Sequence, residues 1–242
     1  MTRLWALGGL VLLAFAGPAM AQQISVDLGG DTSLTARSVQ LLALITLLSL
    51  VPGLAIMITC FPFIVTVLSI LRQGIGLQQS PPNMLIVTLA LFLTYFVMEP
   101  VFLEAWNTAI SPLIEGTLSV ELAVPRGLEP FRVFMVGRID PGTFESLTTL
   151  RPDVTDAVLS PSSPLSLIVP SFLLSEIERA FQVGFLIFLP FLIIDLVVAA
   201  ILMSMGMMMV PPAIVSLPFK LAFFAVADGW TLISGALVRS YF

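Results

Sequence analysis

Long runs of apolar residues, interrupted by proline and glycine, set the pattern of this 242-residue chain. The first run, Val39–Leu71, holds 33 residues without a charge. One membrane-spanning helix needs only about 20. Pro52-Gly53 and Pro62 lie inside the run, so we expect two helical pieces with a kink or break between them.

Three further apolar runs predict membrane spans: Met84–Leu103, Leu165–Met209 and Ala213–Leu237. Proline removes a backbone donor and crowds the preceding turn of a helix. We therefore expect the third run to be subdivided by its proline and glycine residues, namely Pro170, Pro190 and Gly206. The predicted fold class is an all-α integral membrane protein of broken or kinked hydrophobic helices arranged in hairpins.

A polar region, about residues 104–164, separates the second span from the third. It carries 12 of the 25 charged residues, four of them Arg and eight Asp or Glu. Ala105–Leu118 and Pro130–Gly137 have the pattern of helices. We expect a small exposed helical region that is too short, and too poor in core residues, to fold alone.

The N-terminus has the pattern of a cleaved signal peptide over residues 1–21. Arg3 supplies the positive start, Leu4–Ala16 the apolar core, and the small residues Ala19 and Ala21 a cleavage site before Gln22. Residues 22–242 then form a single membrane domain. An uncleaved N-terminal anchor is the alternative interpretation.

Cleavage implies an exported N-terminus in a bacterial inner membrane protein. Four spans then place Arg72 inside the cell and the polar region and the C-terminus in the periplasm. Arg72 alone supplies most of the positive-inside signal.

Composition supports membrane insertion and excludes several functions. The chain is 58% hydrophobic and 10% charged, with a mean hydropathy of +1.07, whereas a soluble domain carries about 25% charged residues. A net charge of −5 with scattered basic residues argues against nucleic-acid binding. The absence of histidine, a single Cys60 and the lack of a glycine-rich phosphate loop predict no metal, no cofactor and no catalysis.

Ionisable residues inside apolar runs are the first functional candidates, because burying an unpaired charge in a membrane is costly. The candidates are Glu99, Glu176, Glu178, Arg179, Asp195, Lys220 and Asp228. One interpretation is a proton or ion pathway; the favoured one is polar bonding between helices or subunits. Glu176 and Arg179 are spaced to pair on one helix. Lys220 and Asp228, about 80° apart around a helix axis, are expected to find partners on other helices or subunits.

A cluster of methionines precedes a double proline near the end of the third run. Five of the eleven methionines fall between Met203 and Met209, and Pro211-Pro212 follows. The cluster is either ordinary core filling or a deformable constriction, because methionine adapts its shape easily. Broken backbone at membrane depth requires protein or a water-filled cavity around it.

Several segments, in order along the chain, resemble the FliP family of type III secretion export-gate subunits. The matching segments are LRQGIGLQQSPPN (Leu71–Asn83), ALFLTYFVMEPV (Ala90–Val101), PSFLLSEIERAFQVGFLIFLPFLIIDLVVA (Pro170–Ala199) and MGMMMVPPAIVSLPFKLAFFAVADGWTLISGAL (Met205–Leu237). The resemblance runs from about Leu41 onward, except for about Glu115–Ser163, and the signal peptide fits the flagellar branch of the family.

The resemblance implies a pentameric ring that assembles with FliQ-like and FliR-like subunits into a helical export gate of the flagellar basal body. Its apolar helices would then pack on one another, largely above the bilayer plane. Unfolded flagellar substrates would pass through the lumen, and a methionine collar would close it. The residues that match this pore seal are Met205, Met207, Met208 and Met209.

Two other function classes compete with a non-enzymatic pore subunit. In a small-ion channel or secondary transporter, Asp195, Lys220 and Asp228 would carry function, although the chain has no evident internal repeat. An intramembrane hydrolase would need a base and a nucleophile motif, and the sequence offers neither.

Overall fold

The structure is a computed structural model that describes residues 34–77, 81–152, 157–207 and 209–242. These residues are helical, with no strand among them. The predicted signal peptide, with its cleavage residues Ala19, Ala21 and Gln22, lies outside the described residues. The chain divides into two units, residues 1–46 and 47–242. Residues 34–46, the first half of helix α2, are the described part of the first unit, whereas the hydrophobic cores lie in the second.

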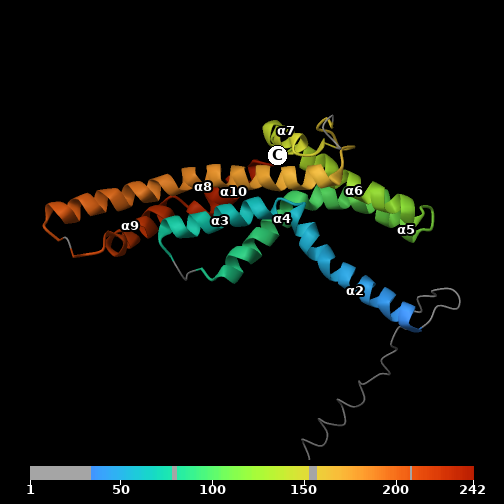
Figure 1. The fold of residues 1–242 in the computed structure, drawn as a ribbon. Coiled ribbons are helices and arrows are strands. Elements are labelled where there is room, and N and C mark those ends of the chain that lie inside the picture. Colours follow the sequence, from blue (N-terminus) through green and yellow to red (C-terminus); the bar gives the residue numbers. More distant parts are fainter. Residues whose placement is uncertain (1–33, 78–80, 153–156, 208) are drawn as a thin grey trace, which may run out of the picture. The chain divides into compact units, whose positions relative to one another are not determined.

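Figure 1 shows the helices of the described residues. In chain order they are α2 (Leu34–Met57), α3 (Phe61–Ile75), α4 (Asn83–Ala105), the π-helix η1 (Trp106–Ile110), α5 (Ser111–Ile114), α6 (Val120–Val136), α7 (Pro141–Thr149), α8 (Leu165–Ser204), α9 (Pro212–Val226) and α10 (Gly229–Arg239).

The first apolar run forms two helices, α2 and α3, as predicted, but the break lies at residues 58–60. Pro52 sits within α2, and Pro62 lies in the first turn of α3, where a missing amide costs nothing. A glycine in the left-handed conformation, Gly76 with φ 88°, ends α3, as is common at helix C-termini.

The polar region departs from the predicted helices in two places. The stretch Ala105–Leu118 contains five residues of π-helix, which widens the helix by one residue per turn. Pro130–Gly137 belongs to the longer helix α6, which begins at Val120 and tolerates Pro125 and Pro130. The end of α6 and the short α7 share a small core with the start of α8, formed by Met135, Ile139, Phe144, Leu167, Ile168 and Phe172.

The third apolar run is one uninterrupted helix of 40 residues, α8, so the expectation that Pro170 and Pro190 would subdivide it is wrong. Proline's fixed φ is compatible with a helix, and each proline removes one backbone donor. Unwinding the chain there would leave several more backbone groups unsatisfied in apolar surroundings, which costs more than the missing donor. The helix ends at Ser204, two residues before Gly206, which was predicted to interrupt the run and has φ 74°.

The last apolar run forms α9 and α10, which meet at a bend of 62°. Asp228 occupies the bend with φ 49°, and Gly229 follows it. A Cβ on Gly229 would lie 2.2 Å from the Phe224 ring, so the bend depends on glycine at this position.

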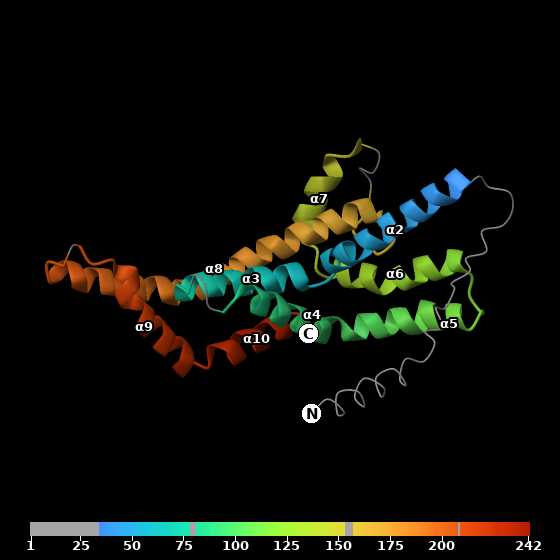
Figure 2. The ribbon, with the colours of Figure 1, turned by 90° about the horizontal axis from the view of Figure 1, so that it is seen from below.

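The main core lies where α3 packs along α8, with α4, α9 and α10 against the pair (Figures 1 and 2). The buried face of α3 recurs at helical spacing, as in Phe63, Val67 and Leu71. Glycines permit the close approach of the two helices, because a Cβ on Gly184 would come within 2.4 Å of the Ile70 side chain.

Three helical segments of the described residues are long and apolar enough to cross a bilayer: Ser38–Met57, Asn83–Ile114 and Leu165–Ser204. The bent pair α9–α10 makes four if it is counted as one span. The helix α3 is apolar but has only 15 residues. The chain is therefore an all-α membrane protein with broken helices, as the sequence predicts.

Replacing Gly184 with Val should weaken the packing of α3 on α8, because the new side chain would collide with Ile70. Overpacking of this kind costs about 1–3 kcal/mol. We expect thermal unfolding of the purified protein in mild detergent at a lower temperature. Gly53→Val is the matched control, since nothing lies within 4 Å of a Cβ there. An equal loss of stability in both variants would contradict this account.

Candidate functional site: the methionine turn and two buried charge clusters

The methionine turn, residues 203–211 between α8 and α9, is a capped helix end. The amide of Gly206 donates to the carbonyl of Met203 at 3.0 Å, and the amide of Met207 donates to that of Leu202 at 3.0 Å. This pair of bonds, with glycine in the left-handed conformation, is a Schellman motif, which satisfies the last carbonyls of the helix. The backbone of the turn is therefore defined up to Met207.

The methionine side chains of the turn are unequally exposed. Met209 is 95% exposed, Met205 66% and Met207 37%. Met208, the fourth predicted seal residue, lies outside the described residues. The turn thus presents flexible apolar side chains outward from the end of α8.

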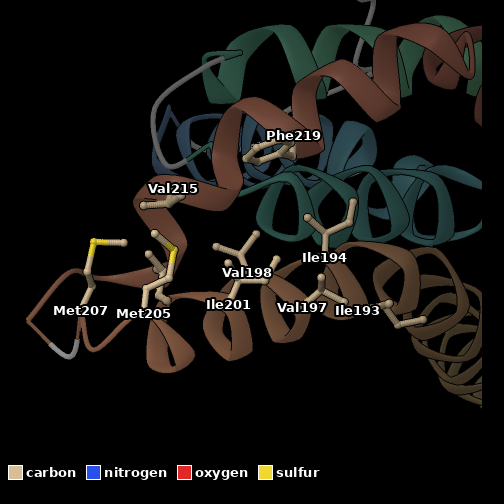
Figure 3. Close-up of a pocket in the computed structure, with 10 residues that line it drawn as sticks. Ile193, Ile194, Val197, Val198, Ile201, Met205, Met207, Val215 and Phe219 are labelled. Atoms are coloured by element: carbon tan, nitrogen blue, oxygen red, sulfur yellow. The ribbon is translucent and has the colours of Figure 1, made fainter.

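An apolar cavity of about 520 Å³ lies beside this turn, between α8 and α9. Met205 and Met207 stand at its loop end, and aliphatic side chains of α8 face Val215 and Phe219 of α9 across it (Figure 3). The described residues that line it include no charged or hydrogen-bonding side chain. The methionines therefore border a space that can accept apolar groups.

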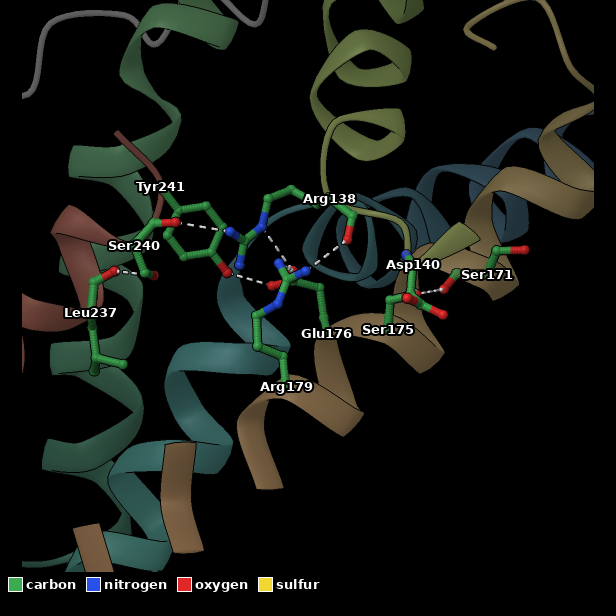
Figure 4. Close-up of polar contacts among 9 residues, drawn as sticks. All are labelled: Arg138, Asp140, Ser171, Ser175, Glu176, Arg179, Leu237, Ser240 and Tyr241. Carbon is green, nitrogen blue, oxygen red and sulfur yellow. Dashed lines mark hydrogen bonds and ion pairs between the residues drawn. The ribbon is translucent and has the colours of Figure 1, made fainter. Parts of the chain in front are cut away.

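The first charge cluster surrounds Glu176, whose side chain is fully buried (Figure 4). Arg138, in the connection between α6 and α7, donates from Nε to Glu176 Oε1 at 3.0 Å. Arg179 lies 3.5 Å from the same oxygen, the pairing that its spacing predicts. Tyr241 donates its phenol proton to Oε2. One carboxylate thus joins α8, the α6–α7 connection and the C-terminal segment.

Tyr241 is held in this cluster by several contacts. The Arg138 guanidinium lies 4.0 Å from the centre of the Tyr241 ring, and its Nη1 donates to the Ser240 carbonyl at 2.8 Å. Burial raises the pKa of the Tyr241 phenol well above its usual range, and the negative charge of Glu176 raises it further. The phenol therefore remains a proton donor to Glu176 throughout the physiological range.

The second charge cluster joins α8, α9 and α3. Lys220 Nζ lies 2.6 Å from Asp195 Oδ2 and donates to the Gly74 carbonyl at 3.1 Å. Ser216, one turn before Lys220, donates to the other Asp195 oxygen. Gly74 lies in the last turn of α3, whose carbonyls have no partner within the helix. Lys220 therefore neutralises a carboxylate and satisfies a helix end at once.

The other predicted ionisable residues are not part of these clusters. Glu99 is exposed on α4, and Glu178 is exposed on α8, where it accepts a hydrogen bond from Gln182. Asp228 is exposed at the α9–α10 bend and accepts from the Thr231 hydroxyl at 3.2 Å. In the described part of the chain, no group of three or more metal-ligating side chains is placed to hold an ion.

Sequence reasoning missed Arg138, Tyr241 and Ser216 as members of the clusters. Ser216 has a local signal, because it lies four residues before Lys220 and shares its helical face. Arg138 and Tyr241 are 38 and 65 residues from Glu176. No spacing rule connects residues so far apart in the sequence.

Comparison with known proteins gives a match over residues 44–237 to the model of the FliP family. The chain belongs to the FliP family. It is 46% identical over 224 residues to the flagellar biosynthetic protein FliP of Caulobacter vibrioides, covering 92% of this chain and 84% of that one. The corresponding protein of Agrobacterium fabrum is 46% identical, with 96% of each chain covered. That of Bacillus subtilis is 42% identical, with 92% of this chain and 100% of the relative covered.

Family membership agrees with the architecture of the chain. The FliP-family match includes α3, α4, α8 and α9, with the methionine turn and both charge clusters apart from Tyr241. The apolar helices and the family together identify a membrane protein of flagellar export.

Glu176→Gln should destabilise the fold, because it leaves Arg138, whose side chain is only 15% exposed, without its charged partner. Removing one partner of a buried pair costs roughly 3–5 kcal/mol. We expect a lower yield of folded protein and a lower unfolding temperature in detergent. Glu178→Gln, two residues along the same helix but exposed, should leave both unchanged. Wild-type stability in Glu176→Gln would refute the structural role of the cluster.

Lys220→Met should destabilise the fold, because Asp195 and the Gly74 carbonyl both lose a partner. The double variant Lys220→Met with Asp195→Leu should recover much of the loss, since no unpaired charge remains. The measurement is the yield of folded protein from membranes and its unfolding temperature in mild detergent. Recovery of normal yield from the single variant, or no rescue by the double variant, would contradict this account.

Proposed function

We propose that this chain is a non-catalytic, pore-forming subunit of the flagellar type III protein export gate. Unfolded flagellar proteins pass through a channel that the methionine turn closes. Met205, Met207, Met208 and Met209 form the seal. The proposal rests on family membership and on the geometry of the turn.

The observation that carries the proposal is a row of flexible apolar side chains on a defined backbone. The Schellman motif holds the end of α8 in place, while Met205 and Met209 extend from it largely exposed. A thioether side chain has three rotatable bonds and no strong hydrogen-bonding group. Such a turn can close a channel against water and yield to passing side chains of varied shape without binding them tightly.

The cavity between α8 and α9 supports a seal that opens by side-chain movement. Met205 and Met207 already line it, and its volume of about 520 Å³ is bounded by apolar atoms. A methionine that withdraws from the channel can enter this space without losing apolar surroundings. Opening then requires rotamer changes near Gly206, where no atom lies within 4 Å of a Cβ position.

Exposed apolar surface along the helices supports a multi-subunit gate. Phe181 and Phe185, one turn apart on α8, are each 60% exposed. Large exposed apolar surfaces indicate contact with lipid or with other subunits. In the proposed gate, these surfaces form the contacts within a pentameric ring and with FliQ-like and FliR-like subunits and other basal-body proteins. Glu99, Glu178 and Asp228 supply polar contacts between subunits.

The same proposal includes location and processing. Residues 1–21 are removed as a signal peptide, residues 22–242 form one domain in the bacterial inner membrane, and the polar region of about 104–164 faces the periplasm. Whether the apolar helices stay in lipid or rise above it on assembly, the methionine turn remains the narrowest point of the channel.

Replacing Met207, Met208 and Met209 together with Ala should make the gate leak ions, because the seal loses volume while its backbone is unchanged. We expect increased permeability of cells or of proteoliposomes that contain the complex. The mass of the particle, purified in mild detergent, serves as the control for assembly. Wild-type permeability in a fully assembled particle would exclude the methionine seal.

A further inference from the structure

A second cavity, of about 430 Å³, lies between the end of α3 and the beginning of α9. Unlike the apolar cavity, this one is lined by two cationic side chains, and no carboxylate is among the described residues that line it. The lining residues are Arg72, Gln73, Gly76, Leu77, Ala213 and Lys220. We propose that this cavity binds the phosphate headgroup of an anionic phospholipid. The proposal is independent of the methionine seal.

Arg72 supplies the charge that a phosphate would meet. Its Nη1 donates to the Pro81 carbonyl at 3.3 Å and to the Asn83 side chain. Among the described residues, Nε and Nη2 have no hydrogen-bond partner that would compete with a ligand. A guanidinium presents its N–H groups as a planar fork that matches two phosphate oxygens.

Two further groups in the cavity can interact with an anion. Lys220 gives two of its three N–H groups to Asp195 and Gly74, which leaves one donor. Because Asp195 balances the Lys220 charge, Arg72 remains the net charge of the cavity. Ala213 lies in the first turn of α9, where helix N-termini favour anions.

Gly76 lies beside the Lys220 ammonium in the lining of the cavity. It is exposed with φ 88°, and a Cβ there would lie 4.0 Å from Lys220 Nζ. The position therefore needs glycine for its backbone, and the absence of a side chain leaves the ammonium uncovered by residue 76.

The surroundings favour a lipid headgroup over a soluble phosphate. Arg72, which lines the cavity, also contacts Asn83 at the start of the apolar helix α4. The next residue, Met84, is 78% exposed, and Ile214 of α9 is also exposed. Arg72 is the single basic residue between Arg37 and Arg126, so it stands alone between long apolar helices. Basic pockets between membrane helices bind acidic headgroups.

The test is native mass spectrometry of the full-length protein in mild detergent, with phosphatidylglycerol and phosphatidylcholine supplied in equal amounts. We expect the wild type to retain phosphatidylglycerol preferentially. Arg72→Gln should lower that preference by about tenfold, since it removes the charge-assisted bonds. Arg72→Lys keeps the positive charge but lacks the planar guanidinium, so it should show an intermediate preference for phosphatidylglycerol. This variant provides the same comparison if Arg72→Gln folds poorly.

Two control variants separate binding from structural effects. Asn83→Ala removes a contact of Arg72 but keeps its charge, and Arg126→Gln removes an exposed arginine from a cavity that also contains Glu104 and Glu129. Both should retain phosphatidylglycerol as the wild type does. Loss of the lipid in Asn83→Ala would mean that Arg72 acts only through the loop, and would overturn the proposal. Equal retention by wild type and Arg72→Gln, or displacement of the lipid by inorganic phosphate, would overturn it as well.

Discussion

The packing of α3 against α8 is the interaction on which the rest of this chain depends. Small residues permit it: a Cβ on Gly184 would collide with Ile70, and one on Gly74 would lie 3.0 Å from the Phe191 ring. Close approach of this kind stabilises helices in apolar surroundings, where a hydrophobic driving force is weak. The other helices of the core, α4, α9 and α10, are placed by the surfaces of this pair.

Ion pairs fix the features of helix packing that apolar contacts leave undetermined. A hydrophobic face defines which side of a helix is buried, whereas an ion pair fixes its rotation and register. Glu176 holds the C-terminal segment and the α6–α7 connection against the first half of α8, and Asp195 holds α9 through Lys220. The two cavities beside α9 remain in the spaces between elements that these pairs hold at fixed positions.

The sequence allowed most helices to be predicted but only some of their interruptions. Apolar periodicity located α4, α8 and α9–α10, and glycine with the double proline located the methionine turn. Pro190 suggested a break that the structure does not have. A helix in apolar surroundings loses fewer backbone hydrogen bonds by keeping one proline than by unwinding. The break at residues 58–60 has no proline of its own, and contacts such as Arg138 with Glu176 depend on the tertiary fold, which local spacing does not encode.

The length of α8 has a mechanical consequence. Its 40 residues correspond to about 60 Å, twice the thickness of the hydrocarbon layer. Glu176 and the methionine turn therefore lie along one continuous helix, with no loop between them. Pro190 lies between them and lacks a backbone donor, so α8 bends most easily at this residue. Flexure there would tilt the methionine end while the buried carboxylate stays in place.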